Sequence, residues 1–350
     1  MNLFQILEVS NVVYNNSLSK VTVDICSVAE KYKFKTIRIV WNSSAKHRFA
    51  KFKKNLRYWW DWHKCYNEIT DNSIVLLQHP LHVANSKVLK KLKSEKNVKY
   101  ISVIIDIEEL RKFYYNEFHK KEFELMLDIA DVLIVHNNIM ARYLIEKGIP
   151  EEKIVNIETF DYLQNNDNVV KFEKSITFAG NLDRSQCSFI EELNQLEQLK
   201  INLYGSNFDK NLSKNPNIKY HGSFPVDEIP KKLNRGFGLV WNGDSIDTCS
   251  GNFGQYLKYN NPHKLSLYLS CGLPVIIWKQ AAQAEFVKKY NVGICVENLK
   301  EAEQIINNMS ENDYKVLQMS VGKIKDLLCS GYFATKAINK ALNLLQSDRD

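Results

Sequence analysis

The sequence predicts an α/β protein with two parallel sheets, each covered by helices. Short apolar, β-branched runs alternate with helix-like segments along the 350 residues, which is the pattern of βαβ units. The series stops at a polar segment near the middle of the chain and then starts again. Hydrophobic residues make up 45% of the chain and charged residues 25%, as in folded globular proteins. Two Rossmann-like domains in tandem, facing each other across a ligand-binding cleft, account for this organisation.

The first domain is expected to span residues 1–157. Its last helix ends at Ile149-Pro150, because proline interrupts a helix. The expected strands are 3–9, 36–41, 73–78, 98–105 and 132–136, and the expected helices are 20–33, 84–93, 119–130 and 138–147.

The second domain is expected to span residues 175–330. The polar segment 158–174, which contains Asn165-Asn166-Asp167-Asn168, is interpreted as the linker between the domains. Residues 331–350 are helical by periodicity from Tyr332 to Leu345, and we expect this helix to pack back on the first domain. The expected strands of the second domain are 175–179, 199–204, 217–221, 236–241, 274–278 and 293–296.

Charge and cysteine content restrict the environment and the partners. The formal net charge of +7 favours an anionic partner such as a nucleotide, a lipid headgroup or nucleic acid. The seven cysteines form no C-x-x-C pair, which predicts reduced thiols in the cytoplasm rather than disulfides or a zinc site. Polar Gln5 and Glu8 interrupt the amino terminus, and no apolar run is long enough to span a bilayer, so we expect neither a signal peptide nor a transmembrane helix.

The segment 249–277 has the features of a phosphate-binding site. Asn261 is suited to cap a helix, Pro262 fits the first helical position, and Lys264 lies in the first turn. A helix start attracts anions through its backbone N–H groups and its dipole, and the lysine adds a full positive charge. The alternative is an ordinary capped helix that packs on a sheet.

A second cation follows the first strand of the second domain. That strand leads into Gly180, which allows close backbone approach, and then to Arg184, which is able to form a bidentate bond to a diphosphate. Together Arg184 and Lys264 would offset the two charges of a nucleotide diphosphate. The alternative is that Arg184 pairs with Asp183 or Glu191 on the surface.

Further donor-binding candidates lie in the loops of the second domain. Asp244 follows the strand 236–241 and is a candidate acceptor for sugar hydroxyls, although a turn role is equally consistent with its position. Gly251 and Gly254 flank a loop that allows the backbone to approach a ligand. The remaining candidates are Asn181, Ser223, Ser250, Asn261 and His263.

Three stretches resemble one family of enzymes. AGNLDRSQCSFI (179–190), FGLVWNGDSIDTCSGNFGQYLKYNNPHKLSLYLSCGLPVIIW (237–278) and IEELR (107–111) are similar to the bacterial β-1,6-galactofuranosyltransferases of O-antigen and capsule synthesis. A more distant likeness joins the chain to glucosyltransferases that extend glycans on serine-rich-repeat adhesins. The resemblance implies a GT-B fold, a UDP-sugar donor held mainly by the second domain, an inverting reaction, and no required metal or other cofactor.

Departures from related patterns refine this expectation. Retaining GT-B enzymes commonly carry a spaced pair of glutamates, at positions that hold Tyr259 and Leu267 here. Neither side chain can bind a hydroxyl as a carboxylate does, so the retaining mechanism loses support. In the resembled family a His-Asp pair usually follows the fourth strand, whereas this chain has Ile105-Asp106.

Inversion requires a base that takes the proton from the attacking hydroxyl. Asp106 ends an apolar run and therefore lies at the carboxyl end of a strand, where ligands bind. Glu108 and Glu109 are alternative bases, and Arg111 is a candidate to orient a carboxylate or to contact acceptor oxygens. The structural alternative is that Asp106 caps the following helix. Acceptor-site candidates are Tyr14, Asn16 and Lys20, although Lys20 is also placed to pair with Asp24 on one helix face.

The stretch KHRFAKFKKNLRYWWDWHK (46–64) interleaves cations with aromatic residues. This composition suits an anionic membrane surface that presents a lipid-diphosphate-linked acceptor. The alternatives are a solvated helix whose aromatics pack on the first domain, and nucleic-acid binding, which no recognised nucleic-acid module supports.

The residues and the resemblance together predict an inverting, metal-independent glycosyltransferase that moves galactofuranose to a sugar hydroxyl of a surface polysaccharide precursor. The choice of UDP-galactofuranose as the donor is implied by the resemblance alone. The first alternative is a UDP-glucose or other UDP-hexopyranose transferase on the same fold. The second is a noncatalytic nucleotide-binding or nucleic-acid-binding protein. We expect a cytoplasmic protein, peripheral on the inner face of the cell membrane, with no nucleic-acid partner; a homo-oligomer is compatible with the sequence.

Overall fold

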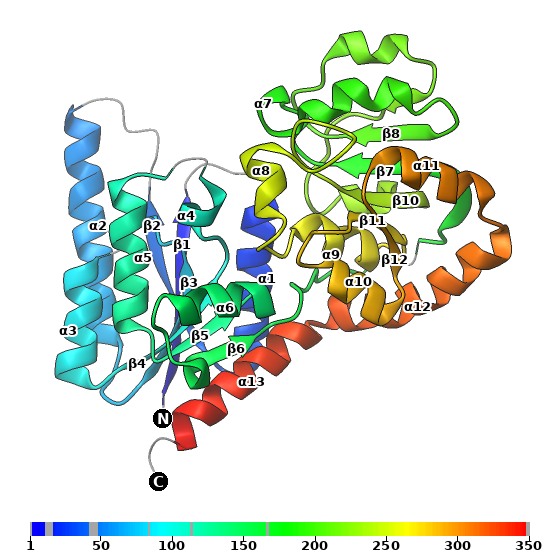
Figure 1. Cartoon of the computed structure of the whole chain (residues 1–350). Helices are drawn as coiled ribbons and strands as arrows, with labels where there is room; N and C mark the ends of the chain where they lie inside the picture. Colours follow the sequence, from blue (N-terminus) through cyan, green and yellow to red (C-terminus); the bar gives the residue numbers. More distant parts are fainter. Residues whose placement is uncertain are drawn as a thin grey trace. The chain divides into compact units, whose positions relative to one another are not determined.

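The computed structural model describes residues 2–10, 17–41, 48–82, 85–112, 115–165 and 168–347. The chain divides into two compact units, Met1–Ile157 with Ala334–Asp350, and Glu158–Phe333. Each unit contains one six-stranded sheet with all neighbouring strands parallel, flanked by helices (Figure 1). The predicted α/β class with two Rossmann-like domains is confirmed.

The sheet of the first unit has the order β2-β1-β3-β4-β5-β6. Figure 1 shows α2, α3 and α5 on one side of this sheet and α1 on the other. The strands are β1 (Leu3–Ser10), β2 (Lys35–Trp41), β3 (Ile74–His79), β4 (Lys99–Ile104), β5 (Val132–Val135) and β6 (Ile154–Asn156). The helices are α1 (Ser17–Lys31), α2 (Arg48–Glu68), α3 (Ser86–Lys96), α4 (Glu108–Arg111), α5 (Glu117–Ile129), α6 (Asn138–Glu146), the 3₁₀ turn η1 (Glu151–Lys153) and α13 (Tyr332–Ser347).

The five strands predicted for this unit are present, and the sixth was missed. β6 has only three residues and lies at the sheet edge, so it is too short to show a periodic pattern. Asparagine, a favoured N-cap residue, caps the amino termini of several helices. Asn85, Asn116 and Asn137 accept hydrogen bonds from the first-turn N–H groups of α3, α5 and α6, respectively.

The sheet of the second unit has the order β12-β11-β10-β7-β8-β9. Strand order therefore reverses between β7 and β10, which makes a topological switch point at which α/β proteins bind ligands. The strands are β7 (Lys171–Ala179), β8 (Lys200–Tyr204), β9 (Ile218–Tyr220), β10 (Arg235–Val240), β11 (Val275–Trp278) and β12 (Gly293–Val296). The α-helices are α7 (Arg184–Cys187), α8 (Gly251–Tyr256), α9 (His263–Ser270), α10 (Ala284–Tyr290), α11 (Leu299–Asn308) and α12 (Glu311–Ser330), and the 3₁₀ segments are η2 (Ser188–Gln195), η3 (Lys210–Lys214) and η4 (Ile229–Lys232).

The segment 158–174, which was interpreted as the linker, contains buried side chains. Phe160 and Tyr162 are buried in the second unit, where the Phe160 carbonyl accepts a hydrogen bond from Ser266 Oγ at 2.6 Å. β7 begins at Lys171, four residues before the predicted strand. The apolar residues of this segment alternate with polar ones, so the sequence pattern did not indicate that they are buried.

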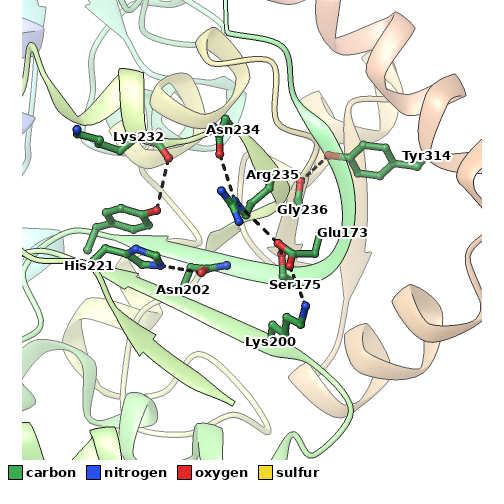
Figure 2. A network of polar contacts seen from close by, with 11 residues as sticks. Glu173, Ser175, Lys200, Asn202, His221, Lys232, Asn234, Arg235, Gly236 and Tyr314 are labelled. Atoms are coloured by element: carbon green, nitrogen blue, oxygen red, sulfur yellow. Dashed lines mark hydrogen bonds and ion pairs between the residues drawn. The ribbon is translucent and has the colours of Figure 1, made fainter. Parts of the chain in front are cut away.

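A polar network at the amino ends of β7, β8 and β10 fixes α12 to the second sheet (Figure 2). Glu173 accepts from Lys200 Nζ at 3.1 Å and lies 4.0 Å from Arg235 Nε. The buried Tyr314 hydroxyl of α12 donates to the Gly236 carbonyl at 2.6 Å. These contacts stabilise the amino ends of the strands. A ligand would bind at the opposite, carboxyl ends.

Candidate functional site

The carboxyl ends of β7 and β10 lie side by side at the switch point of the second unit. The register pairs Phe237 with Ile176 and Gly238 with Thr177, so both strands end at the same edge. β7 continues into Gly180, and β10 continues through Trp241 into Asn242. The first turn of α9 adds a lysine, Lys264, to this edge.

Lys264 is the centre of the candidate site. Its ammonium lies 3.3 Å from Asn242 Oδ1 and 4.8 Å from the centroid of the Phe178 ring. A Cβ atom built on Gly180 would lie 2.8 Å from Cε of Lys264, so the glycine makes room for the lysine. The structure thus brings together Gly180 and Lys264, two predicted residues, with Asn242, which was not among the predicted site residues although it lies in the predicted loop.

The ammonium of Lys264 has no anionic partner in the described part of the chain. Burial lowers the pKa of Lys264, and the nearby Cys187 thiol acts in the opposite direction. No carboxylate contributes to this balance. A cation that is partly withdrawn from water at a switch point, without a carboxylate, is electrostatically prepared for a bound anion.

The start of α9 differs in detail from the sequence prediction. Pro262, not Asn261, is the N-cap residue, and it makes no side-chain cap hydrogen bond. Asn261 is buried and bonds elsewhere: its Nδ2 donates to the Glu158 carbonyl at 3.1 Å, and its Oδ1 accepts from Gln283 Nε2 at 2.5 Å. The predicted Asn261 cap is therefore wrong, because buried partners distant in the sequence compete for the amide. His263, the first residue of α9, stacks on Tyr162 with ring centroids 5.0 Å apart.

Arg184 has its own carboxylate partners. Its guanidinium forms ion pairs with Glu191 and, at 3.8 Å, with Asp209, and its side chain is 67% exposed. Glu191 chiefly raises the pKa of Arg184. Asp183 instead caps α7 by accepting from the Ser185 N–H at 2.9 Å. In this arrangement Arg184 and Lys264 have separate partners, and a shared diphosphate for both remains a prediction.

The other donor-binding candidates lie in loops around this edge. Asp244 is exposed, accepts from Ser188 Oγ at 3.3 Å, and donates its N–H to Ser250 Oγ at 3.3 Å. Asn181 Oδ1 accepts from Asn207 Nδ2 at 2.7 Å. Gly254 is buried in α8, where a Cβ atom would come within 2.5 Å of the Cys249 carbonyl carbon.

Ser223 lies farther along the same edge. It is exposed and follows β9, which is separated from β7 by β8. No described contact joins Ser223 to Lys264.

Asp106 and Glu108 of the first unit lie together with Arg111. Arg111 Nη1 is 3.3 Å from Asp106 Oδ2 and 2.9 Å from Glu108 Oε1. The N-cap residue of α4 is Ile107, without a side-chain cap bond, so Asp106 does not occupy the cap position that was its structural alternative. The structure thus brings the three predicted catalytic residues into one cluster at the carboxyl end of β4.

Sequence reasoning missed a buried histidine beside this cluster. His79 ends β3, which pairs with β4 so that His79 lies opposite Ile104. Its Nδ1 contacts Glu122 Oε1 of α5, and both residues are buried. A signal was present in the sequence, because His79 directly follows the apolar run 73–78 and therefore stands at the carboxyl end of a predicted strand.

The acceptor-site candidates are only partly described. Tyr14 and Asn16 lie outside the described residues. Lys20 is buried and forms an ion pair with Asp24 on α1, so this pair exists but is not on the surface.

The basic aromatic stretch 46–64 forms most of α2. Lys46 and His47 lie outside the described residues. Trp62 is fully buried, whereas Trp59 and Trp60 are 55% and 57% exposed. Tyr58 is partly buried and packs against the same core as Trp62. Two of the described aromatic side chains therefore pack on the first unit, as the solvated-helix alternative expects, and Trp59 and Trp60 do not. No helix among the described residues is both long and apolar enough to span a bilayer.

Comparisons with known proteins identify relatives of both units. The model of the Glucosyltransferase 3-like N-terminal domain matches residues 5–159, and that of the C-terminal domain matches residues 176–341. The chain is 36% identical over 254 residues to the β-1,6-galactofuranosyltransferase WbbI of Escherichia coli (strain K12), covering 71% of this chain and 72% of that protein. It is 26% identical to Glucosyltransferase 3 of Streptococcus gordonii, covering 70% and 71%, respectively.

Solved structures agree on the fold. Anabaena HepE in complex with UDP and glucose superposes with a TM-score of 0.62 at 13% identity, covering 98% of this chain and 100% of that one. At this identity the likeness bears on the fold alone, and it confirms the predicted GT-B class of fold.

Proposed function

The chain belongs to the Glucosyltransferase 3-like family of glycosyltransferases, and on this premise we propose that it transfers a sugar from a UDP-sugar donor whose diphosphate binds at Lys264. One observation carries the proposal. The Lys264 ammonium, with an amide oxygen and an aromatic ring as its described contacts and no carboxylate, lies at the β7–β10 switch point.

A diphosphate supplies the negative charge that the Lys264 site lacks. It supplies the negative charge that would hold Lys264 in its charged form, and the first turn of α9 offers a helix start for its oxygens. As the bond to the sugar breaks, charge develops on the departing UDP, and a fixed cation stabilises it. In the proposed reaction, protein cations therefore stabilise the negative charge of the departing UDP, and no metal ion or further cofactor takes part.

We propose UDP-galactofuranose as the donor and a sugar hydroxyl of a surface polysaccharide precursor as the acceptor. The β-1,6-galactofuranosyltransferase relative, at 36% identity, supports this choice. The alternative is UDP-glucose or another UDP-hexopyranose, which the 26% identical Glucosyltransferase 3 relative favours. Furanose and pyranose donors carry the same charge, so the Lys264 site does not distinguish them.

The proposed reaction inverts the anomeric centre. The acceptor hydroxyl attacks the anomeric carbon, the bond to UDP breaks, and the electron pair leaves with the β-phosphate. Asp106 takes the hydroxyl proton, and Arg111, which lies 3.3 Å from this carboxylate, orients it. Tyr259 and Leu267 in place of the paired glutamates of retaining enzymes support inversion.

Lys264→Met tests the diphosphate site. Titration calorimetry with UDP should show at least a tenfold loss of affinity, roughly the 1.4 kcal/mol or more that a charge-assisted contact contributes. Lys258→Met is the matched control, because Lys258 lies over the Trp278 ring instead of at the switch point. Unchanged UDP affinity in Lys264→Met would contradict the proposed site.

Donor turnover tests the reaction. Purified protein is incubated with UDP-galactofuranose, UDP-galactopyranose or UDP-glucose and a set of alkyl glycosides, and UDP release is measured. We expect release with UDP-galactofuranose and its loss in Asp106→Asn at nearly unchanged UDP affinity. Failure to turn over any donor, together with salt-sensitive oligonucleotide binding, would favour the noncatalytic alternative.

We also propose that α2 contacts an anionic membrane surface, at the inner face of the cell membrane, where a lipid-diphosphate-linked acceptor is presented. Trp62 and Cys65 are buried on one face of the helix. Leu56, Trp59 and Trp60 are about half exposed, and helical spacing places them together on the opposite face. Arg57 and Lys64 are exposed beside them, so this surface offers both aromatic rings and positive charge to lipid headgroups.

Liposome flotation tests this surface. Vesicles with phosphatidylglycerol should float the protein at low salt, and neutral phosphatidylcholine vesicles should not. Trp59→Ser with Trp60→Ser should reduce flotation severalfold. Val316→Ser with Met319→Ser, which removes two other exposed apolar side chains from α12, is the control and should float as the wild type does. Equal flotation of both double variants would contradict the proposal.

A further inference from the structure

A small cavity lies beside the Asp106 cluster of the first unit. Its volume is about 10 Å³, which is the space that one water molecule needs. Asp106, Glu108 and Glu109 line it from the β4–α4 side. His79, His119 and Glu122 complete its polar wall. Three buried polar atoms of these residues, His79 Nε2, Glu108 Oε2 and His119 Nδ1, have no hydrogen-bond partner within the described structure.

Such atoms are costly unless they are satisfied. A buried polar atom without a partner has lost its hydrogen bonds to water, and a water with two to four polar partners restores them. The cavity has the size and the polar lining to hold one. Water in this position would link His79 to the carboxylates next to it.

His79 is held in a defined orientation. Its Nδ1 contacts Glu122 Oε1, which also accepts the Leu81 N–H at 2.9 Å. Because a carboxylate only accepts, the ring proton belongs on Nδ1, which leaves the Nε2 lone pair free to accept a proton. The imidazole is 1% exposed, so it exchanges protons through the cavity and not directly with bulk solvent.

The backbone of His79 also positions Asp106. The His79 carbonyl accepts hydrogen bonds from the N–H groups of Ile105, at 2.7 Å, and Asp106, at 3.3 Å. The end of β3 and the loop after β4 are therefore joined at the residue that carries the imidazole. Movement of this loop relative to the imidazole is restricted.

We propose that His79, oriented by Glu122, is the final acceptor of the proton that Asp106 takes from the acceptor hydroxyl, and that one water in the cavity carries it between them. The inference rests on the proposed transfer reaction. The acceptor O–H bond breaks as the oxygen bonds to the anomeric carbon, and the proton goes to Asp106. Asp106 gives a proton to the water, and the water gives one of its own to Nε2, which leaves Asp106 ionised and His79 as an imidazolium next to Glu122.

The chemical reason is the charge next to the ring. The Glu122 carboxylate contacts Nδ1, so a negative charge is already in place to stabilise the imidazolium that forms when Nε2 takes the proton. The charged and titratable groups around His79 are Glu122 and His119 of α5, Asp106, Glu108, Glu109 and Arg111 of the β4–α4 region, and His82 after β3.

His79→Asn and Glu122→Gln test the relay in the full-length protein, with the UDP-sugar that the wild type turns over. We expect kcat to fall about 10- to 100-fold in His79→Asn, as for loss of part of a general-base system, with the donor KM and the UDP affinity within twofold of wild type. The acid limb of the kcat–pH profile should shift, because Asp106 then no longer has the His79 imidazole as the acceptor of its proton. Glu122→Gln, which keeps the volume of the side chain, should show the same shift to a smaller extent.

His136→Asn is the matched control, because His136 is equally buried in the same unit but bonds to the Ile104 carbonyl at 3.0 Å and does not line the cavity. It should lower stability without moving the acid limb. An unshifted limb in His79→Asn, or an equal shift in His136→Asn, overturns the relay.

A second measurement needs no variant and covers the case in which the variants do not fold. The wild-type rate in mixtures of H₂O and D₂O should depend on deuterium content along a curve, because more than one proton moves, and a straight line overturns the relay. A wild type that turns over no UDP-sugar overturns the proposed function and the relay together, whereas wild-type turnover with a straight line overturns the relay alone.

Discussion

Gly180 and Lys264 show how one residue prepares the space for another. The lysine side chain crosses the position at which a larger residue in place of Gly180 would carry its Cβ atom. The atom that would be displaced is Cε of a flexible side chain and not backbone. A substitution at Gly180 should therefore affect the lysine more than the fold.

Gly180→Ala should weaken UDP binding by several fold, because the new methyl group displaces the Lys264 ammonium. The unfolding midpoint in urea should change little. Gly322→Ala is the control: a Cβ atom at Gly322 meets nothing within 4 Å, and alanine in the interior of α12 should stabilise the protein by about 0.5–1 kcal/mol. Calorimetry with UDP and urea unfolding measure both effects. Full UDP affinity in Gly180→Ala would mean that the lysine position does not matter for binding.

His136 predicts a pH dependence of stability. Burial lowers the pKa of His136 to about 4, and hydrogen bonds to the backbone at Ile104 and Ile105 act in the opposite direction. The ordinary value is 6.5, so between pH 6.5 and about 4 the unfolded chain binds more protons than the folded protein. The stability that the neutral ring contributes is fully present above pH 6.5 and decreases as the pH falls through this window.

Urea unfolding of the wild type and of His136→Asn at pH 7.5 and 5.0 measures this term. The wild type should lose more unfolding free energy between the two pH values than the variant, by on the order of 1 kcal/mol. Equal losses would show that this ring does not cause the acid sensitivity.

At the scale of elements, the two edges of the second sheet have different tasks. The amino ends of β7, β8 and β10 carry paired charges and a buried hydroxyl that connect the strands to α12 (Figure 2). The carboxyl ends of β7 and β10 carry a glycine, an amide and an unmatched lysine. Because the edges are opposite, stability and ligand binding should respond to different substitutions.

Tyr314→Phe should separate stability from binding. It removes the hydroxyl that bonds the Gly236 carbonyl at 2.6 Å and leaves that buried acceptor without this donor, which should cost about 1–3 kcal/mol. Lys200→Ala removes an ion pair whose lysine is 72% exposed and should cost under about 1 kcal/mol. Thermal unfolding gives the first effect and UDP titration should show no change in either variant. A large loss of UDP affinity in Tyr314→Phe would contradict the separation of the two edges.

At the scale of the whole molecule, the end of the chain returns to the unit that contains its beginning. Residues 334–350 belong with residues 1–157, and Asn339 Nδ2 of α13 donates to the Tyr32 hydroxyl at 2.6 Å. Ile338 and Ala341 of α13 are buried. The first unit is therefore complete only when the last helix has been made.

Ile338→Ala should destabilise the first unit by about 2–4 kcal/mol through the lost apolar contacts and the cavity that remains. UDP affinity should be unchanged, because the proposed diphosphate site is built from the second unit. Exposed Met319→Ala on α12 is the control, with an expected change under about 0.5 kcal/mol. Hydrogen exchange resolves the two units, and increased exchange confined to residues 158–333 in Ile338→Ala would contradict the assignment of α13.

Local patterns in the sequence were sufficient for the elements of both sheets. Eleven of the twelve strands were predicted. A β-branched run between turn residues is a local pattern, so it is recognised without knowledge of the tertiary structure. The missing strand, β6, has too few residues for such a pattern. The start of α9 was found with its lysine but with the wrong cap, because Gln283 and Glu158, far away in the sequence, bond the side chain of Asn261.

The sequence by itself determined the fold class, the order of the strands along the chain and a cation near the start of a helix. Only the tertiary structure decided that β10 lies next to β7 and β3 next to β4, and these pairings bring Asn242 to Lys264 and His79 to the Asp106 loop. The physical reason is that periodicity records which side of each segment avoids water, whereas the neighbours of a strand depend on how the complete sheet packs. Residues separated by dozens of positions acquire a common chemistry only through that packing.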